Sequence, residues 1–515
     1  MASPAATSFL PVWQARFLLT MVLAIATAGL VYELGMGAVA SYVLGDSVRQ
    51  FSLVIGAYLS ALGLGAFLSR YVDKELATTF VNVELSAALV GGLSSPALFM
   101  AFSLGASFQL LLLVIVASVG TLVGIELPLL MRILESRLSF KDLVARSLTY
   151  DYAGALIGSL AFSLYLVPRL GLVRTSIVCG LVNASVGLAA TWVLFPSGER
   201  QRSRLAQLRW SGLGVLVVLL AALLYAPAGV TWAESRTYGR AQRAVDSQYQ
   251  RLLLTERDHH LELYLNGHLQ FSSQDECRYH EALVHPTLGL SPHPRRVLIG
   301  GGGDGLALRE VLKWPSIERV VLVDLDPEMT ALAARQPGLV ALNRHSLSDQ
   351  RVDVQNADAF QWVSHGNERY DAVILDFPDP TSLGVGKLFT TTFYRRLKNV
   401  LAPDAVVVVQ ATSPLLSPNS FWSIEHTLAS VGYHTRPLRV FVPSFGDWGF
   451  VVAKLGQLPT EPSVPQSVEL HCLDRRGLAW LSEFPADTRP TQISVNRLDN
   501  QSLVSTYLEE AQRLD

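Results

Sequence analysis

Two carboxylates stand three residues apart directly after an apolar run of the chain. The stretch "AVILDFPDP" (372–380) reads as a buried strand that ends at Asp376, followed by a proline-stiffened loop that carries Asp379. Both carboxyl groups can therefore converge on one site, where two like charges repel each other and are stabilised by a bound cation. The spacing predicts a site for a positively charged amine, and a diamine would satisfy both acids.

A third acid stands in a glycine-rich turn. The stretch "VLIGGGGDGLALREVL" (297–312) reads as strand, turn and helix, and Gly300, Gly302 and Gly305 satisfy the G-x-G-x-x-G pattern. That pattern alone fits NAD enzymes, methyltransferases and other nucleoside-binding folds. Asp304 narrows the choice, because a carboxylate in the turn repels a pyrophosphate and attracts a sulfonium or an amine. The loop predicts a nucleoside with a positive tail, such as S-adenosylmethionine or its decarboxylated form.

Two further strand ends carry acids. Asp324 closes the next strand, at the distance expected for an acid that bonds ribose hydroxyls. Asp358, in "QNADAF", closes a later strand, where it could accept a hydrogen bond from an adenine amino group. A solvated acid at a strand end is the alternative reading of Asp358.

A cluster of polar side chains precedes the glycine-rich turn. The run "QDECRYHEALVH" (274–285) contains Tyr279, His280 and Glu281, and it has no Cys/His spacing that suggests a metal site. Taken alone, the run also fits the polar face of an ordinary amphipathic helix. Considered together with the acids downstream, the run predicts further contacts to an amine.

The second half of the chain supplies a scaffold that can bring these strand ends together. The stretch "RLLLTERDHHLELYLNGHLQF" (251–271) alternates like antiparallel strands, with a turn at Asn266-Gly267. Five later runs, from "RRVLIG" to "AVVVVQA", each end where a helix or loop begins, as in a mostly parallel doubly wound sheet. Ligands of such sheets bind beyond the carboxyl ends of the strands, so the acids are expected to meet there.

The first half of the chain has a different composition. The whole sequence is 50% hydrophobic with a mean hydropathy of +0.32, which is too apolar for an average soluble enzyme. Between residues 14 and 229, long apolar runs alternate with short charged connectors, and each run can cover the roughly 20 helical residues that a bilayer requires. We count seven candidate spans, centred near Ala26, Leu59, Val90, Val116, Gly158, Val186 and Val218.

The expected fold is therefore a polytopic α-helical membrane domain of about seven spans, followed by an α/β Rossmann-like domain of the methyltransferase type with a small N-terminal β-hairpin subdomain. Residues after Lys454 are rich in Pro and Ser and read as a linker. The expected boundaries are 1–231 for the membrane domain, 232–290 for the β subdomain, 291–456 for the Rossmann-like domain and 457–515 for the linker and C-terminal cap.

Charged residues in the first half bear on function and on topology. Four acids fall within or at the margins of the spans, where ionisable groups are costly and often functional: Glu33, Glu84, Glu126 and Asp151. Some of these lie at the interfaces if the span boundaries are off by several residues. Basic residues concentrate in the second, fourth and sixth connectors: Arg70, Lys74, Arg132, Arg137, Lys141, Arg146, Arg200, Arg202, Arg204 and Arg209. With seven spans, the positive-inside rule would place the C-terminal half outside the cell.

Composition also excludes some partners. The net charge is −2 and no basic stripe with interleaved aromatics is present, so nucleic acid is not expected as a partner. The three cysteines, Cys179, Cys277 and Cys472, are far apart and form no C-x-x-C pair. We therefore expect three reduced, structural thiols and no thiolate metal site.

Together these motifs resemble the spermidine synthase family of polyamine aminopropyltransferases. The resemblance covers about residues 249–453 in the family's order: "YQ", "LNGHLQ…DECRYHE", "VLIGGGGDG…LREVLK", "VVLVDLD", "NADAF", "ILDFPDP…LFTTTFY" and "PSFGDWGF". Single motifs are weak, but the ordered set is specific. The apolar first half further resembles the membrane-embedded subgroup of this family.

The resemblance implies transfer of an aminopropyl group from decarboxylated S-adenosylmethionine, as a co-substrate, to a polyamine acceptor, with putrescine the foremost acceptor. Methylthioadenosine would leave, and no permanently bound cofactor or metal is implied. Asp376 would be the catalytic acid-base residue, and Tyr279 would help to orient the attacking amine. The nucleoside would contact Gln250, Gly301, Gly303, Asp324, Asp358 and Ala359. The amine would contact His280, Glu281, Asp304 and Asp379.

The sequence departs from the family pattern near the amine. Asp324 stands where members commonly have Glu, which shortens the reach to the ribose but keeps the chemistry. The run "PTSLG" (380–384) lacks the glycine- and proline-rich stretch of soluble members, and "PSFGDWGF" (443–450) has an extra residue beside the usual Pro-Ser-Gly. The identity of the amine is therefore the least constrained expectation.

Two other functions stay open. A methyltransferase that uses intact S-adenosylmethionine is disfavoured, because the carboxylate of that substrate would meet Asp304. A membrane polyamine transporter or sensor with a non-catalytic binding domain would use the acids in the spans. The expected partners are a diamine or polyamine, the lipid bilayer and, as in soluble members of the family, further copies of the chain. Because the co-substrate is made in the cytosol, we expect the catalytic half to face the cytoplasm of the cell membrane, against the connector charges.

Overall fold

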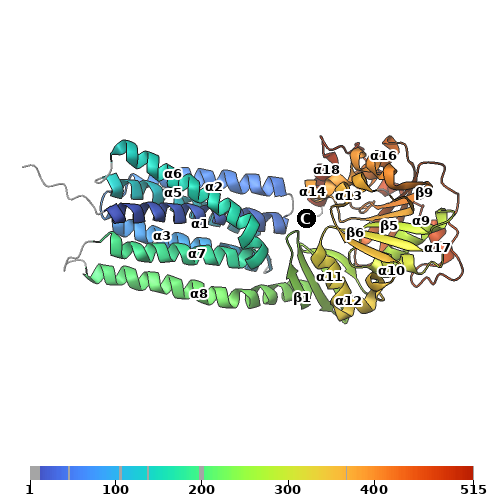
Figure 1. The fold of residues 1–515 in the computed structure, drawn as a ribbon, viewed down its shortest axis with the longest axis horizontal. Helices are drawn as coiled ribbons and strands as arrows, with labels where there is room; N and C mark the ends of the chain where they lie inside the picture. The colour runs from blue at the N-terminus through green and yellow to red at the C-terminus, as the bar shows by residue number, and fades with distance from the viewer. Residues whose placement is uncertain are drawn as a thin grey trace, which may run out of the picture. The chain divides into compact units, whose positions relative to one another are not determined.

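The chain forms two compact units, Met1–Ala241 and Gln242–Asp515. The computed structural model (Figure 1) describes residues 12–44, 47–103, 107–135, 139–195, 202–366 and 368–513. Arg137 and Arg200, two of the basic connector residues, lie outside these ranges. The boundary between the units falls later than residue 231, because the last helix of the first unit continues to Tyr238.

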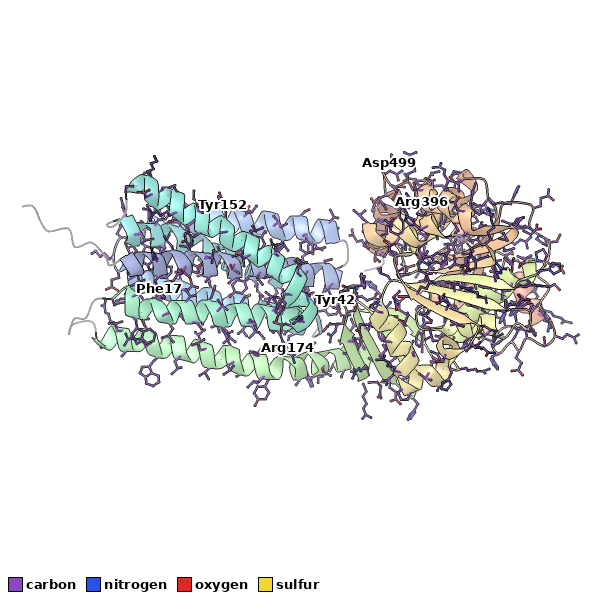
Figure 2. All side chains as sticks on the ribbon, viewed as in Figure 1. Phe17, Tyr42, Tyr152, Arg174, Arg396 and Asp499 are labelled. Carbon is purple, nitrogen blue, oxygen red and sulfur yellow. A yellow bond between two sulfur atoms is a disulfide. The ribbon has the colours of Figure 1, made fainter. Side chains whose placement is uncertain are left out.

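Long apolar helices build the first unit. In chain order they are α1 (Val12–Leu44), α2 (Ser47–Ser69), α3 (Leu76–Gly92), α4 (Ser94–Ser103), α5 (Phe108–Glu135), α6 (Phe140–Ala161), the π-helical turn η1 (Phe162–Leu166), α7 (Val167–Val193) and α8 (Arg202–Tyr238). Six helical stretches among the described residues are long and apolar enough to cross a membrane. Large apolar side chains point outward from them (Figure 2), and Tyr152 on α6 is 69% exposed.

The count of six differs from the seven predicted spans because one stretch, 140–193, is 54 residues long. A straight helix of that length would extend about 80 Å, well over twice the thickness of a bilayer core. The stretch instead leaves helical geometry at Gly171 (φ 71°, ψ 172°). Figure 1 shows α6 and α7 as two separate helices of the bundle. The predicted spans near Gly158 and Val186 correspond to these two helices.

The acids predicted within the spans are mostly enclosed by the helices. Glu33, Glu84 and Glu126 are at most 8% exposed, whereas Asp151 is half-buried. Glu84 and Glu126 interact with each other, and no hydrogen-bond donor from a third residue among those described reaches their carboxylate oxygens. These two side chains therefore lie inside the bundle rather than at its ends.

A four-stranded sheet opens the second unit. Its strands lie in the order β1 (Arg240–Asp246), β2 (Arg251–Arg257), β3 (His260–Leu265) and β4 (His268–Ser272). The predicted turn joins β3 and β4, where Asn266 and Gly267 both have positive φ, as a two-residue hairpin turn requires. The small subdomain is thus larger than the expected hairpin.

A seven-stranded, mostly parallel sheet follows, in the order β10-β11-β9-β8-β5-β6-β7. Its strands are β5 (Arg296–Gly301), β6 (Arg319–Asp324), β7 (Val352–Asn356), β8 (Tyr370–Asp376), β9 (Leu401–Gln410), β10 (His434–Val442) and β11 (Gly446–Lys454). The chain adds β6 and β7 on one side of β5 and then places β8 on the other side. Doubly wound sheets bind ligands at such a switch point.

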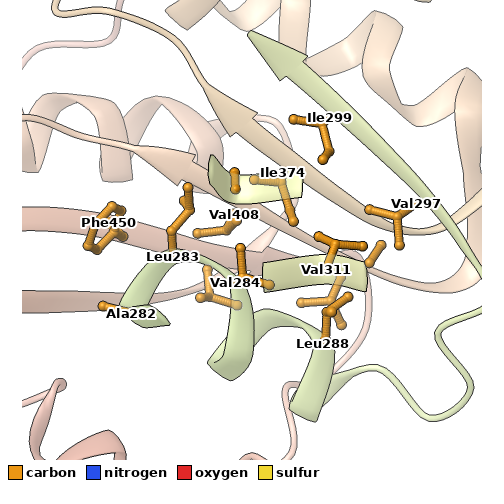
Figure 3. Packing of buried hydrophobic residues seen from close by; sticks show 14 of the residues in the cluster. Ala282, Leu283, Val284, Leu288, Val297, Ile299, Val311, Ile374, Val408 and Phe450 are labelled. Atoms are coloured by element: carbon orange, nitrogen blue, oxygen red, sulfur yellow. The ribbon is translucent and has the colours of Figure 1, made fainter. Parts of the chain in front are cut away.

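Apolar clusters cover both faces of this sheet. Successive residues of a strand point to opposite faces, so Ile299 belongs to one cluster and Leu298 to the other. Figure 3 shows the first cluster, where Leu283 and Leu288 pack beneath the strands. The helices of this unit are α9 (Glu276–Leu290), α10 (Leu306–Leu312), α11 (Pro327–Arg335), α12 (Pro337–Leu342), α13 (Ala359–His365), α14 (Leu383–Gly386), α15 (Thr391–Leu397), α16 (Pro418–Ser430), α17 (Arg475–Trp480) and α18 (Ser502–Ala511).

The segment after β11 returns to α9 and is fixed there. The buried carboxylate of Glu281 accepts three backbone N–H bonds, from His471 (2.5 Å), Cys472 (3.1 Å) and Leu473 (2.8 Å). A disulfide joins Cys277 to Cys472. Two expectations from the sequence therefore fail, because Glu281 is committed to this segment rather than to an amine, and two of the three thiols are not reduced. The buried Cys179 is free.

We expect the disulfide to contribute about 2–4 kcal/mol to the stability of the second unit, since it closes a loop of 195 residues. Reductant should therefore lower the thermal unfolding midpoint of the purified protein by roughly 5–15 °C. Cys472→Ser should show the lower midpoint with or without reductant.

Cys179→Ala is the matched control, because it removes the free thiol and should respond to reductant as the natural chain does. If reductant lowers the midpoint of Cys472→Ser as well, the effect has another origin.

Candidate active site

The glycine-rich loop passes directly over the end of β8. In the parallel register of the sheet, Gly301 pairs with Asp376. Gly301 and Gly302 have φ of 79° and 64°, a left-handed backbone that favours glycine. A Cβ on Gly302 would lie 3.3 Å from Asp376 Oδ2. The loop therefore depends on glycine for its conformation and for its approach to the acid.

Asp376 is held by a tyrosine from α9. The Tyr279 hydroxyl donates a hydrogen bond of 2.6 Å to Asp376 Oδ1. Burial raises the pKa of Asp376 to about 6, against the charge of His280 and the Tyr279 bond, both of which lower it. A carboxyl group with this pKa can take up a proton near neutral pH. The structure thus brings together the two residues predicted to be catalytic.

His280 is oriented by an ion pair that the sequence did not reveal. Its Nδ1 lies 2.7 Å from Glu276 Oε2, and Arg309 makes two bonds of 2.8 and 2.9 Å to the same carboxylate. Burial alone would lower the pKa of His280, but the bond to Glu276 and its charge outweigh burial and raise it. The i,i+4 spacing of Glu276 and His280 on a helix was the available signal for this pair.

The third acid that the sequence singled out, Asp304, lies in the glycine-rich loop, and its charge acts on Tyr279. Asp304 accepts the Leu306 N–H at 2.8 Å, and burial raises its pKa although His280 opposes that shift. The charges of Asp376, Asp379 and Asp304 all act on the Tyr279 hydroxyl, in that order of strength. All three carboxyl groups that the sequence singled out therefore raise the pKa of Tyr279, and Asp376 bonds it directly.

Asp379 is bonded on both oxygens by residues that sequence reasoning missed. Gln410, at the end of β9, donates from Nε2 to Oδ1 at 2.8 Å. Tyr507, on α18, donates from its hydroxyl to Oδ2 at 2.7 Å. Burial raises the pKa of Asp379, and both bonds oppose that change. The strand-end position of Gln410 was a usable signal, whereas nothing local marks Tyr507.

On the other side of the loop, Asp324 is tied to the glycines. The Gly303 N–H donates to Asp324 Oδ2 at 3.0 Å, and a Cβ on Gly303 would lie 2.6 Å from that oxygen. Burial raises the pKa of Asp324 to about 6. Gln250 reaches the same region, since its Nε2 bonds Asp326 Oδ2 at 3.0 Å and the Asp326 N–H bonds Asp324.

Asp358 and Ala359 lie at the start of α13. Asp358 Oδ1 accepts the Phe360 N–H at 2.9 Å, and Oδ2 pairs with Lys387 Nζ at 2.6 Å. The Ala357 N–H bonds the Asp324 carbonyl at 3.0 Å, which ties this loop to the end of β6. The carboxylate that was predicted to meet an adenine amino group is therefore already engaged by Lys387. The described residues contain no group of three or more His, Cys, Asp or Glu side chains placed to hold a metal ion.

Known proteins match the chain over nearly its whole length. The spermine/spermidine synthase domain matches residues 276–462. A polyamine aminopropyltransferase of Leptospira interrogans is 44% identical over 494 residues, which cover 96% of this chain and 98% of that protein. Polyamine aminopropyltransferase 2 of Ralstonia nicotianae is 47% identical over 498 residues, with coverage of 96% and 97%.

A crystal structure of spermidine synthase in complex with the transition-state analogue AdoDATO is also similar, with 29% sequence identity and a TM-score of 0.45 over 48% of this chain and 86% of that one. The two curated relatives extend through both units of the chain, because their alignments cover 96% of it. This chain belongs to the polyamine aminopropyltransferase family and is an aminopropyl-transferring enzyme.

Proposed function

We propose that the enzyme transfers the aminopropyl group of decarboxylated S-adenosylmethionine to putrescine, forming spermidine and methylthioadenosine. The observation that carries this proposal is the position of Asp376, which pairs with Gly301 of the glycine-rich loop and accepts the hydrogen bond of the Tyr279 hydroxyl. Asp304 and Asp379 also act electrostatically on Tyr279, and such acids favour a ligand with several positive charges, as when a diamine meets a sulfonium in this reaction.

The reaction is a displacement at carbon. The amine nitrogen attacks the methylene group beside the sulfonium, the carbon–sulfur bond breaks, and its electron pair leaves with the sulfur of methylthioadenosine. Since the sulfur departs uncharged, the leaving group needs no acid. A protonated amine cannot attack, so the protein must align the amine and remove a proton from it. Asp376 accepts that proton in this proposal.

The residues around the glycine-rich loop suit the nucleoside. Gln250, Gly301, Gly303, Asp324, Asp358 and Ala359 are the proposed contacts, and Asp358 would accept a bond from the adenine in addition to its bond from Lys387. His280, Asp304 and Asp379 are the proposed contacts of the amine chain. Intact S-adenosylmethionine carries a carboxylate that the charge of Asp304 would oppose, so methyl transfer is disfavoured.

Replacing Asp376 by Asn tests its role as the base. Asp376→Asn removes the proton acceptor while preserving shape, so kcat should fall by about 10²- to 10⁴-fold. The rate of methylthioadenosine formation measures this loss. Asp404→Asn, which changes an exposed acid on β9, is the matched control and should keep its activity. An Asp376→Asn enzyme with unchanged kcat would remove Asp376 from the mechanism.

The bond from Tyr279 gives a second test through pH. Activity requires ionised Asp376, so kcat/KM should rise with pH through about 6. The Tyr279 bond lowers the pKa of Asp376, so Tyr279→Phe should raise that pKa and move the acid limb to higher pH. Deprotonation of the amine substrate also affects the pH profile, but it affects the natural enzyme and Tyr279→Phe equally.

Tyr433→Phe provides the control for this pH profile. It removes another buried hydroxyl, which bonds the Tyr394 carbonyl at 3.1 Å, and it should leave the limb in place. A limb at the same pH in Tyr279→Phe would contradict the assignment to Asp376.

We further propose that the first unit spans the cell membrane with the catalytic unit in the cytoplasm, where the co-substrate is made. The six apolar stretches and their outward-facing apolar side chains support insertion. Seven crossings with cytoplasmic basic connectors would predict the opposite side, and a disulfide is typical of an oxidising compartment.

A fluorescent reporter fused after Asp515 decides the orientation. We expect fluorescence in intact cells, because the reporter folds only in the cytoplasm. A phosphatase fusion that is active only outside the cytoplasm should be silent, and activity of that fusion would place the catalytic unit outside.

A further inference from the structure

We propose that Tyr507 on α18 is a positioning residue of the amine site, so that the C-terminal segment sets the enzyme's affinity for its acceptor. The inference rests on the proposed function, since it takes Asp379 as the contact of the amine. Tyr507 lies beyond residues 276–462, which match the family domain.

The hydrogen bonds at Asp379 leave a place for an ammonium group. Gln410 Nε2 bonds one carboxylate oxygen and the Tyr507 hydroxyl bonds the other, and the Thr412 side chain also acts on this carboxylate. Gln410 is 3% exposed, and its Oε1 has no hydrogen-bond partner among the described residues. A buried amide oxygen without a donor is costly. An ammonium bound at Asp379 would supply one.

The backbone beside Gln410 points to the same function. Thr412 has a φ of 61°, a left-handed conformation that is rare and strained for a β-branched residue. Its side chain contributes hydrogen bonds to both Asp379 and Tyr507. Strain of this kind persists where the surrounding structure fixes it, and it clusters at functional sites.

Helix α18 is anchored firmly enough to orient Asp379. The Glu510 carboxylate accepts the N–H groups of Asn419 (2.8 Å) and Ser420 (3.1 Å) at the start of α16. Leu503 belongs to one of the sheet's apolar clusters. Val504 contacts Gly386, on the helix that follows the Asp379 loop.

A second anchor joins the C-terminal segment to the chain just after Asp379. The buried Asn496 donates to the carbonyls of Gly386 (3.1 Å) and Phe389 (3.2 Å), and its own carbonyl accepts the Thr391 N–H at 2.9 Å. The Asp379 loop and Tyr507 are thus held by one hydrogen-bonded framework. Side chains that orient a ligand-binding carboxylate in this way affect binding without touching the ligand.

Steady-state kinetics of Tyr507→Phe in the full-length enzyme test the proposal. Loss of the bond should raise KM for putrescine about tenfold, with kcat and the KM of the co-substrate nearly unchanged, because the amine is held equally in the ground and transition states. The Tyr507 bond lowers the pKa of Asp379. The ratio of variant to natural KM should therefore grow as the pH is lowered, because the variant's Asp379 takes up a proton at a higher pH than the natural enzyme's does.

A merely structural role predicts a different pattern. Ser505→Ala, an exposed change on the same helix, should leave all constants unchanged. In an Asp379→Asn background, Tyr507→Phe should have no further effect on KM, because the two residues act through one contact. A Tyr507→Phe enzyme with unchanged amine KM, or with equal losses for both substrates, would overturn the proposal. A thermal midpoint lowered in step with activity would overturn it as well.

The outcome is separable from that of the proposed function. If the natural enzyme forms no spermidine from putrescine, the proposed acceptor is wrong. If it does so and Tyr507→Phe behaves like the natural enzyme, only the role of Tyr507 fails.

Discussion

The parallel pairing of β5 with β8 is the constraint on which the rest of the site depends. These strands are not neighbours in the chain, yet their register places Gly301 opposite Asp376. Gly301 and Gly302 have positive φ, which lets the loop pass close to the carboxylate of Asp376. The Gly303 N–H then bonds Asp324 at the end of β6. The proposed nucleoside and the proposed base therefore meet because of one strand pairing.

Burial gives the acids at this point their chemistry. An ordinary aspartate has too low a pKa to accept a proton from an amine efficiently, but burial brings the pKa of Asp376 to about 6. The same burial raises the pKa of Asp304 and Asp379, so the site favours any ligand that brings positive charge. His280, fixed by Glu276 and Arg309, moderates this charge without removing it.

Sequence patterns predicted much of this arrangement because its residues lie at strand ends and in local motifs. Asp376 and Asp304 could be placed from the strands that precede them. Tyr279 could be placed because acids with a related predicted role follow it in the sequence. The failures share another cause. Glu281 and Cys277 meet the chain near Cys472 only because the C-terminal segment returns to α9, which no local spacing encodes.

Tyr507 was missed for the same reason, since α18 reaches Asp379 through tertiary contacts with α16 and the loop that follows Asp379. The apolar helices of the first unit show the reverse case. The apolar runs of the sequence predicted two separate helices within residues 140–193. A criterion of helix length and hydropathy counts this stretch as one, but the bend at Gly171 divides it. Patterns of hydrophobicity and turn residues thus predicted the elements, while contacts between distant segments had to be observed.

In the proposed function, Asp376 and the acids near it serve aminopropyl transfer to a diamine. Product analysis of the purified enzyme with putrescine and decarboxylated S-adenosylmethionine tests it most directly. The account predicts spermidine and methylthioadenosine in equal amounts, and no methylated amine when intact S-adenosylmethionine replaces the decarboxylated form. Methylated product from intact S-adenosylmethionine, or no methylthioadenosine with any diamine, would contradict it.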